Sequence, residues 1–147
     1  MLERSVPMYQ ECQSLAVHWC TQFAQAHTSV YDLGCSTGTL LLKLAQSIDK
    51  KKEVSLFGVD NSPAMLEKSK ITLRESPMPC EFIEADLNQG FSIQNASVVV
   101  MNYTLQFVLP EHRDQLLKNI FEGLLPGGSP VIIEKIKSGI PELDHTF

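Results

Sequence analysis

The chain has 147 residues, of which 44% are hydrophobic and 20% charged, as in one ordinary globular domain. This composition excludes a collagen-like or low-complexity chain, and the length allows a core to form without disulfide staples. Lysine and arginine total 12 and the acidic residues 17, so the formal charge of −5 disfavours a module that clamps a nucleic-acid backbone.

The first third of the chain alternates between helical and strand patterns. From Met8 to about Gln25, apolar residues recur at helical spacing, which predicts a helix with one apolar face. The residues of that face are Cys12, Leu15, Ala16, Trp19, Cys20 and Phe23. Ser29–Leu33 has the composition of a short buried strand, and Gly38 then opens a helix that reaches Ile48. The lysine-rich segment 50–53 indicates a solvated turn.

The alternation continues to residue 134. Further strands are predicted at Val54–Val59, Cys80–Glu84, Ala96–Met101 and Pro130–Glu134. Asn61-Ser62-Pro63 is a helix start signal, and the helix that it opens is predicted to run to about Arg74. Another helix is predicted from Glu111 to Leu124, closed by Pro126-Gly127-Gly128.

Strands that are apolar on both faces and alternate with helices predict a mostly parallel sheet with helices on each side. We therefore expect an α/β, doubly wound fold in a single domain, residues 1–147. It would have an N-terminal helical segment (1–28), a core (29–135) and a tail (136–147). In such folds the ligand crevice lies at the carboxyl ends of the strands. The polar residues at those ends are Asp32, Gly34, Asp60, Asp86 and Asn102.

The first strand-to-helix turn, from Asp32 to Gly38, has the pattern D-x-G-x-S-x-G. Glycines at this corner let the backbone turn tightly and approach a ligand closely. Ser36 stands where dinucleotide-binding folds usually place a second glycine beside a pyrophosphate. The turn therefore favours a nucleoside ligand without phosphate over NAD.

Acidic residues end the second and third predicted strands. Asp60 can accept hydrogen bonds from both hydroxyls of a ribose, and Asp86 can accept one from an exocyclic amine such as adenine N6. A single acid at a strand end often only caps the next helix. Two acids beside a glycine turn favour the nucleoside site.

Gly34 to Gly38 also spells G-x-S-x-G, the nucleophile elbow of α/β-hydrolases. Only one helix and one strand precede it, and neither His112 nor His145 follows a strand end with an acid placed before it. The sequence therefore disfavours a hydrolase. Cys35 has no histidine base nearby in the sequence, so packing against a ligand is favoured over a nucleophilic role.

Other residue patterns limit the cofactors and the location. The cysteines have neither zinc nor redox spacing and indicate free thiols; they are Cys12, Cys20, Cys35 and Cys80. No Asp/His cluster has metal-ligand spacing, so we expect no metal. The sequence shows no membrane span and no signal peptide, so the expected location is the cytoplasm.

Several segments make the chain similar to the carboxy-S-adenosyl-L-methionine synthase family, within the class I S-adenosylmethionine-dependent methyltransferases. They are Arg4-Ser5-Val6-Pro7-x-Tyr9, Val30-Tyr31-Asp32-Leu33-Gly34-Cys35-Ser36, Asp60-Asn61-Ser62-Pro63-Ala64-Met65 and Asn102-x-Thr104-Leu105-Gln106-Phe107. Leu124-x-Pro126-Gly127-Gly128 and Glu134-Lys135 also fit. The resemblance spans residues 4–135 and implies a Rossmann-like methyltransferase fold that lacks the C-terminal strands.

The resemblance implies a synthase as the activity. In that family prephenate loses carbon dioxide, which the methyl group on the sulfonium of S-adenosyl-L-methionine captures. The products are carboxy-S-adenosyl-L-methionine and phenylpyruvate, and the former supplies a carboxymethyl group for the wobble uridine of tRNA. The expected partner is thus a small molecule, prephenate, with no direct nucleic-acid or membrane contact.

The resemblance also implies cofactor-binding residues but no catalytic residue. Tyr9 would contact the amino acid end of the cofactor, and Gly34, Cys35 and Ser36 would line its centre. Asp60 and Asn61 would hold the ribose, and Asp86 and Leu87 would frame the adenine. Asn102 would lie near the sulfonium. For Tyr9 and Asn102 the pattern alone favours an interfacial aromatic residue and a strand-end hydrogen bond.

The family's chain extends beyond both ends of this one, and its arginine for the added carboxylate has no counterpart here. Without the family's later strands, the fifth strand would be exposed and would favour association, such as a homodimer. Two other interpretations stay open. One is an ordinary S-adenosylmethionine-dependent methyltransferase acting on tRNA or a small molecule, and the other is a non-catalytic truncated fragment.

Overall fold

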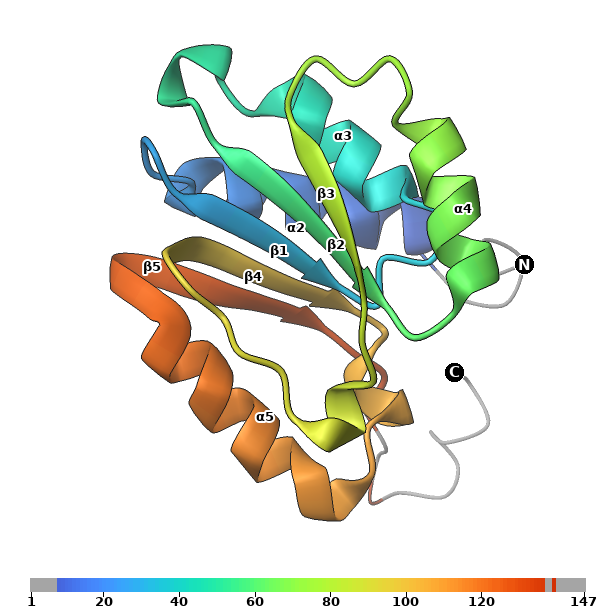
Figure 1. Cartoon of the computed structure of the whole chain (residues 1–147). Helices are drawn as coiled ribbons and strands as arrows, with labels where there is room; N and C mark the ends of the chain where they lie inside the picture. Colours follow the sequence, from blue (N-terminus) through green and yellow to red (C-terminus); the bar gives the residue numbers. More distant parts are fainter. Residues whose placement is uncertain (1–7, 137–138, 140–147) are drawn as a thin grey trace.

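Strands and helices follow one another along the chain as the alternating pattern predicts (Figure 1). The computed structural model describes residues 8–136 and residue 139. Its strands are β1 (Ser29–Leu33), β2 (Ser55–Asp60), β3 (Cys80–Glu84), β4 (Ala96–Asn102) and β5 (Leu124–Ile133). Its helices are α2 (Tyr9–Phe23), α3 (Thr39–Ser47), α4 (Pro63–Thr72) and α5 (Pro110–Gly123), with 3₁₀ turns η1 (Lys50–Lys52), η2 (Leu87–Gln89) and η3 (Leu105–Phe107).

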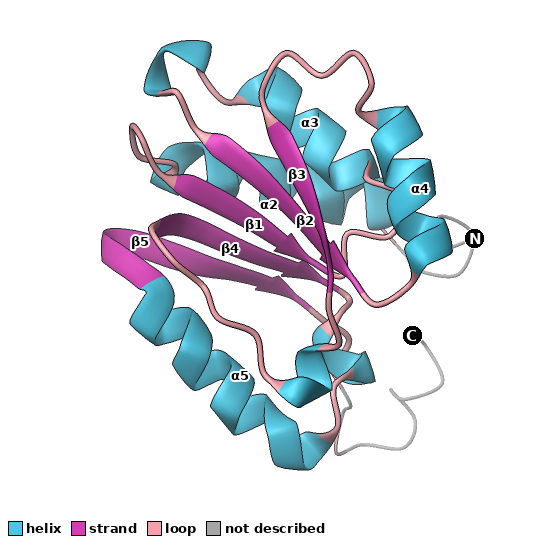
Figure 2. Cartoon of the chain, viewed as in Figure 1, coloured by secondary structure: helices cyan, strands magenta, loops and turns pink. Residues whose placement is uncertain are grey.

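All strand pairs in the described residues are parallel, and the sheet order is β3-β2-β1-β4-β5 (Figure 2). The chain builds outward from β1 to β3 and then crosses to the other side of β1 to form β4. This reversal between β1 and β4 is the switch point at which a crevice opens in doubly wound folds. Asp32 pairs with Val100, so Gly34, just after β1, lies level with Asn102, the last residue of β4.

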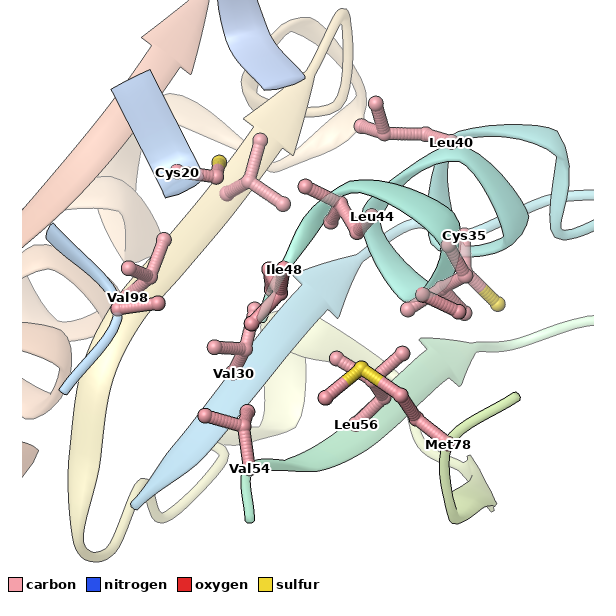
Figure 3. Packing of buried hydrophobic residues seen from close by; sticks show 14 of the residues in the cluster. Cys20, Val30, Cys35, Leu40, Leu44, Ile48, Val54, Leu56, Met78 and Val98 are labelled. Carbon is pink, nitrogen blue, oxygen red and sulfur yellow. The ribbon is translucent and has the colours of Figure 1, made fainter. Parts of the chain in front are cut away.

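Helices cover both faces of the sheet and form two cores. Helices α2, α3 and α4 cover one face of the sheet and α5 covers the other (Figure 1). Their inward side chains form the two cores. Every residue of β1 is buried, as is every residue of β4 except Asn102, which explains their apolar sequences. Leu41, Leu44 and Leu56 are fully buried in the larger core, each side chain stabilising the fold by about 1.5–3 kcal/mol. Leu44 and Leu56 are labelled in Figure 3.

The start signal of α4 is confirmed. Ser62 is the N-cap, and its Oγ accepts a hydrogen bond of 3.4 Å from the backbone N–H of Met65. Pro63 occupies the first helical turn, where its missing N–H costs no hydrogen bond.

The inward face of α2 differs from the predicted apolar face. Leu15 and Trp19 are 55% and 46% exposed, whereas Gln13 is only 2% exposed and faces inward with Ala16 and Cys20. The small side chains of Ala16 and Cys20 let the helix approach the sheet closely. The amide of Gln13 is buried because both of its ends form hydrogen bonds, so polarity alone misplaced this face.

The fifth strand begins earlier than predicted, at Leu124 instead of Pro130, so it includes the Pro126-Gly127-Gly128 segment that was expected to close the last helix. The helix ends at Gly123, and these residues lie within β5. Ala96 pairs with Leu124 and Val98 with Ser129, so residues 125–128 bulge between two ladder pairs. Gly127 supplies the left-handed backbone (φ 78°), and the side chain of Gln25 donates to the Pro126 carbonyl at 3.1 Å.

The lysine-rich segment forms the predicted turn, with Lys50 and Lys51 exposed, but Lys52 is half-buried. The segment forms η1, and the ammonium of Lys52 donates to the carbonyls of Ala24 (2.7 Å) and Thr21 (3.4 Å). These carbonyls lie at the C-terminus of α2, where a cation stabilises a helix by about 0.3–1 kcal/mol.

Within the part of the chain that the structure describes, no helix is long and apolar enough to cross a membrane. The segment Arg4-Ser5-Val6-Pro7 and His145 lie outside the described residues, as does most of the predicted tail.

Candidate functional site

A pocket of about 450 Å³ lies at the carboxyl ends of β1 and β4, at the switch point of the sheet. Its volume falls within the range of about 300–1,000 Å³ that is typical of small-molecule sites. The residues that line it are Tyr9, Gln13, Asp32, Gly34, Cys35, Ser36, Thr37, Thr39, Leu40, Met65, Lys68 and Asn102.

The glycine turn after β1 is anchored on two sides. The backbone N–H groups of Gly34 and Cys35 both donate to the Val59 carbonyl, at 2.7 and 3.0 Å. On the other side, Thr104 Oγ1 donates to the Leu33 carbonyl at 2.7 Å. Gly34 has φ 79°, and a Cβ there would lie 2.4 Å from Thr104 Oγ1. Only glycine therefore fits between the turn and the segment after β4.

Asp60, at the end of β2, ties this turn to α4. Its Oδ2 accepts from the backbone N–H of Ser36 at 2.9 Å, and its Oδ1 accepts from that of Ser62 at 2.9 Å. Ser36 has a left-handed backbone (φ 51°), and the bond to Asp60 helps to hold it there. The two carboxylate oxygens keep further lone pairs with which they can accept from a ligand.

Asp32 brings a buried acid to the pocket wall. The residue is 2% exposed, and burial followed by the negative charge of Asp60 raises the pKa of its carboxyl to about 7. A positively charged ligand in the pocket would favour the ionised form and would lower this pKa. The pocket thus suits a cationic small molecule.

We expect the elevated pKa of Asp32 to make the free energy of unfolding fall as the pH rises from about 4 to 7. The folded protein holds this proton more tightly than the unfolded chain, so the stabilisation is complete below pH 4 and is lost above pH 7. The expected change is roughly 2–4 kcal/mol. Urea unfolding at pH 5 and pH 8 measures it, with Asp32→Asn as the control that removes this dependence. Equal pH dependence in the two proteins would contradict the assignment.

Asn102 presents an unsatisfied acceptor at the pocket. Its Oδ1 is buried and, within the described residues, has no hydrogen-bond partner. The next residue, Tyr103, has a left-handed backbone (φ 59°), held by a bond of 2.8 Å from its N–H to the Ile133 carbonyl. The Gln106 side chain donates to the Tyr103 carbonyl at 3.0 Å. A buried acceptor held so firmly indicates a ligand that carries a donor group.

Comparisons with known proteins agree with this geometry. A family model described as a methyltransferase domain matches residues 30–128. The chain belongs to this family. A carboxy-S-adenosyl-L-methionine synthase from Methylococcus capsulatus is 46% identical over 138 residues, which cover 92% of this chain and 57% of the relative. This methyltransferase domain spans a little over half the length of the curated relatives that it matches.

Solved structures show the same fold at low sequence identity. An S-adenosylmethionine-dependent methyltransferase from Clostridium acetobutylicum has a TM-score of 0.72 at 16% identity, covering 89% of this chain and 52% of that protein. The N-methyltransferase NodS from Bradyrhizobium japonicum, solved with S-adenosylhomocysteine, has a TM-score of 0.71 at 18% identity. The match covers 86% of this chain and 61% of NodS. The predicted class I methyltransferase fold is thus confirmed.

The structure of this methyltransferase domain brings some of the predicted site residues to the pocket. Those that line it are Tyr9, Gly34, Cys35, Ser36 and Asn102. The other predicted site residues are absent from the described lining and lie after β2 and β3; they are Asp60, Asn61, Asp86 and Leu87. They continue along the edge of the sheet at which the pocket opens.

Asp86 also serves the turn that follows it. Its Oδ1 accepts from the backbone N–H and the Nδ2 of Asn88, both at 2.9 Å, and these bonds lower the pKa of its carboxyl. This is the capping role that the sequence also allowed. An adenine contact by Asp86 stays a prediction.

Cys35 lines the pocket but does not have the chemistry of a nucleophile. Its side chain lies in the larger core, and burial raises the pKa of the thiol to about 12, helped by the negative charge of Asp32 (Figure 3). The thiol is therefore neutral at physiological pH. Among the described residues that line the pocket there is no histidine beside Ser36, as a hydrolase would require.

Sequence reasoning missed several residues of the lining. The sequence pattern indicates Asp32 only as a polar residue at a strand end, and it does not mark Lys68 as part of a site. Gln13 carried a detectable signal, since it shares helical spacing with Ala16 and Cys20. A polar residue on that face indicates either a buried hydrogen-bond network or a site.

Proposed function

We propose that this methyltransferase domain binds S-adenosyl-L-methionine and takes part in its conversion, with prephenate, into carboxy-S-adenosyl-L-methionine and phenylpyruvate. The observation that carries the proposal is the 42–46% identity to curated relatives that are named as that synthase. The unsatisfied Oδ1 of Asn102 in the pocket supports it, because Asn102 opens one of the two segments that make the resemblance specific. The product would serve modification of the wobble uridine of tRNA.

The residues present fit the cofactor. Asp32 places a buried carboxyl, and Asn102 an unsatisfied acceptor, in a pocket for a ligand with a sulfonium and an ammonium group. In the proposed arrangement Tyr9 meets the amino acid end, and the backbone of residues 34–36 lines the centre. Asp60 and Asn61 hold the ribose, and Asp86 and Leu87 frame the adenine. The cofactor supplies a methyl group made acidic by the positive sulfur.

The overall conversion balances without a further reactant. The carbon dioxide that leaves prephenate becomes bonded to the methyl carbon of the cofactor. The proton lost from that methyl group and the hydroxide lost from the prephenate ring leave together as water. The part that we assign to this chain is to hold the cofactor close to prephenate and to exclude bulk water.

The same proposal extends to location and partners. We place the protein in the cytoplasm, with prephenate as its small-molecule partner and without direct contact to tRNA. The formal charge of −5 supports the last point. β5 is an edge strand of the sheet within the described residues, and an unpaired edge supports association into a homodimer.

Mass spectrometry of the nucleoside released when the purified protein is denatured tests the proposal. We expect S-adenosylmethionine that carries one added carboxyl group. Release of S-adenosylmethionine or S-adenosylhomocysteine alone, without the carboxylated form, would instead favour an ordinary methyltransferase. A protein that carries no nucleoside and binds neither form when it is added would contradict the proposal. Asn102→Ala is expected to lose the ligand, whereas Asn119→Ala on α5 should retain it, because the Asn119 side chain bonds to Gln115 and Phe91 and does not line this pocket as described.

A further inference from the structure

A chain of hydrogen bonds runs from α3 through α2 to the pocket. Lys43 Nζ donates to Gln13 Oε1 at 2.6 Å, and Gln13 Nε2 donates to Tyr9 Oη at 2.8 Å. Tyr9 and Gln13 both line the pocket, and Gln13 is almost fully buried. Lys43 is half-buried and lies behind them, outside the lining.

The chemistry of Lys43 fixes the direction of every bond in this chain. An ammonium can only donate, so the oxygen of the Gln13 carboxamide must face Lys43 and its NH₂ must face Tyr9. The NH₂ can also only donate, so the phenol oxygen of Tyr9 accepts. The hydroxyl hydrogen of Tyr9 is therefore directed away from Gln13, and any group that it meets has to be an acceptor.

The ring of Tyr9 is also held from its other side. It stacks on the ring of Tyr103, with the centroids 6.4 Å apart and the planes 21° from parallel. Tyr103 follows Asn102, and its strained backbone is fixed to β5. The position of the ring is thus set by α2 and by the segment that follows β4, while Lys43 sets the direction in which its hydroxyl donates.

We propose that Lys43 and Gln13 are positioning residues that turn Tyr9 into a hydrogen-bond donor toward the carboxylate of the ligand's amino acid part. This inference rests on the proposed function, because it takes S-adenosyl-L-methionine as the ligand. Without Lys43 the Gln13 carboxamide can rotate by half a turn and present its oxygen to Tyr9. The hydroxyl then donates to Gln13 and no longer to the carboxylate.

Gln13→Glu tests the direction of the hydrogen bond between residue 13 and Tyr9 with little change in the shape of the side chain. The new carboxylate still accepts from Lys43, but its second oxygen accepts from Tyr9 and reverses that bond. Calorimetric titration should show affinity for S-adenosyl-L-methionine about tenfold weaker or more, since a hydrogen bond to a charged group is lost. Affinity for adenosine, which lacks the amino acid part, should not change. Lys43→Met should also weaken the affinity for S-adenosyl-L-methionine, and the matched control Lys118→Met on α5 should leave that affinity unchanged.

The Tyr9→Phe background separates this role from a structural one or a direct charge effect. If Gln13 acts through the Tyr9 hydroxyl, Gln13→Glu should cost no further affinity once that hydroxyl is absent. The inference is overturned if the loss persists in Tyr9→Phe, if adenosine binding weakens equally, or if both variants bind S-adenosyl-L-methionine like the wild type. A wild-type protein that binds neither ligand overturns the proposed function, and the inference with it.

Discussion

Gly34→Ala is expected to lose roughly 2–5 kcal/mol of the free energy of unfolding and to abolish cofactor binding. A Cβ at this position would lie 2.4 Å from Thr104 Oγ1 and 2.6 Å from Thr104 Cγ2, so the turn or the segment after β4 must move. The positive φ of 79° adds the cost of a left-handed alanine, about 1–2 kcal/mol. Urea unfolding measures the first effect, and calorimetric titration with S-adenosyl-L-methionine measures the second.

Gly90→Ala is the matched control. Gly90 also has a positive φ, 84°, but a Cβ there meets no atom within 4 Å. Its ψ of 136° puts its backbone outside the left-handed helical region, where a Cβ is also disfavoured, so Gly90→Ala should lose stability too but should bind the ligand normally. Binding that is kept in Gly90→Ala and lost in Gly34→Ala would assign the effect on the ligand to the glycine turn and its contact with Thr104. Equal losses of binding in both variants would show that this contact does not constrain the site.

Asp60→Asn is expected to weaken the binding of nucleosides by about 100-fold, since hydrogen bonds to a charged acceptor contribute about 1.5–3 kcal/mol each. The proposed ribose role requires a group that accepts from two hydroxyls at once. In the wild type the backbone N–H groups of Ser36 and Ser62 donate to the two carboxylate oxygens. An asparagine keeps one oxygen as an acceptor but places its NH₂ group, a donor, against one of these N–H groups. Titration with adenosine and with 2′,3′-dideoxyadenosine measures the effect.

The preference for adenosine over the dideoxy analogue should be large in the wild type and nearly absent in Asp60→Asn. Glu84→Gln is the control, because Glu84 pairs with Asp60 across the sheet but is exposed. It should keep the preference. An Asp60→Asn protein that still prefers adenosine as strongly as the wild type would leave Asp60 only its role in tying the glycine turn to α4.

The sequence predicts four of the five strands well because their signal is local. β1 and β3 have the predicted bounds, β4 continues one residue further, and β2 begins and ends one residue later than predicted. Such strands are short runs bounded by polar or turn-forming residues. β5 begins earlier than predicted, at Leu124, because residues 125–128 bulge within the strand instead of preceding it. Gln25, about a hundred residues earlier in the chain, donates to the Pro126 carbonyl in this bulge, and the local pattern contains no sign of that partner.

The candidate site divides in the same way. Gly34, Ser36 and Asp60 could be predicted because parallel strands end at one edge and their polar residues gather there. Tyr9 and Asn102 were assigned through the family resemblance alone. The part played by Gln13 and Lys43 could not be predicted, because the pairing joins two helices and no spacing within either one encodes it.

Three residues in or directly beside the rim of the pocket have a positive φ: Gly34 and Ser36 in its lining, and Tyr103 next to Asn102. Each donates its backbone N–H to another element: Gly34 to Val59, Ser36 to Asp60 and Tyr103 to Ile133. Fixing the backbone of one residue costs about 1–2 kcal/mol of conformational entropy. Here that cost falls on folding rather than on association, so a ligand meets a preorganised rim and retains more of its contact energy as affinity.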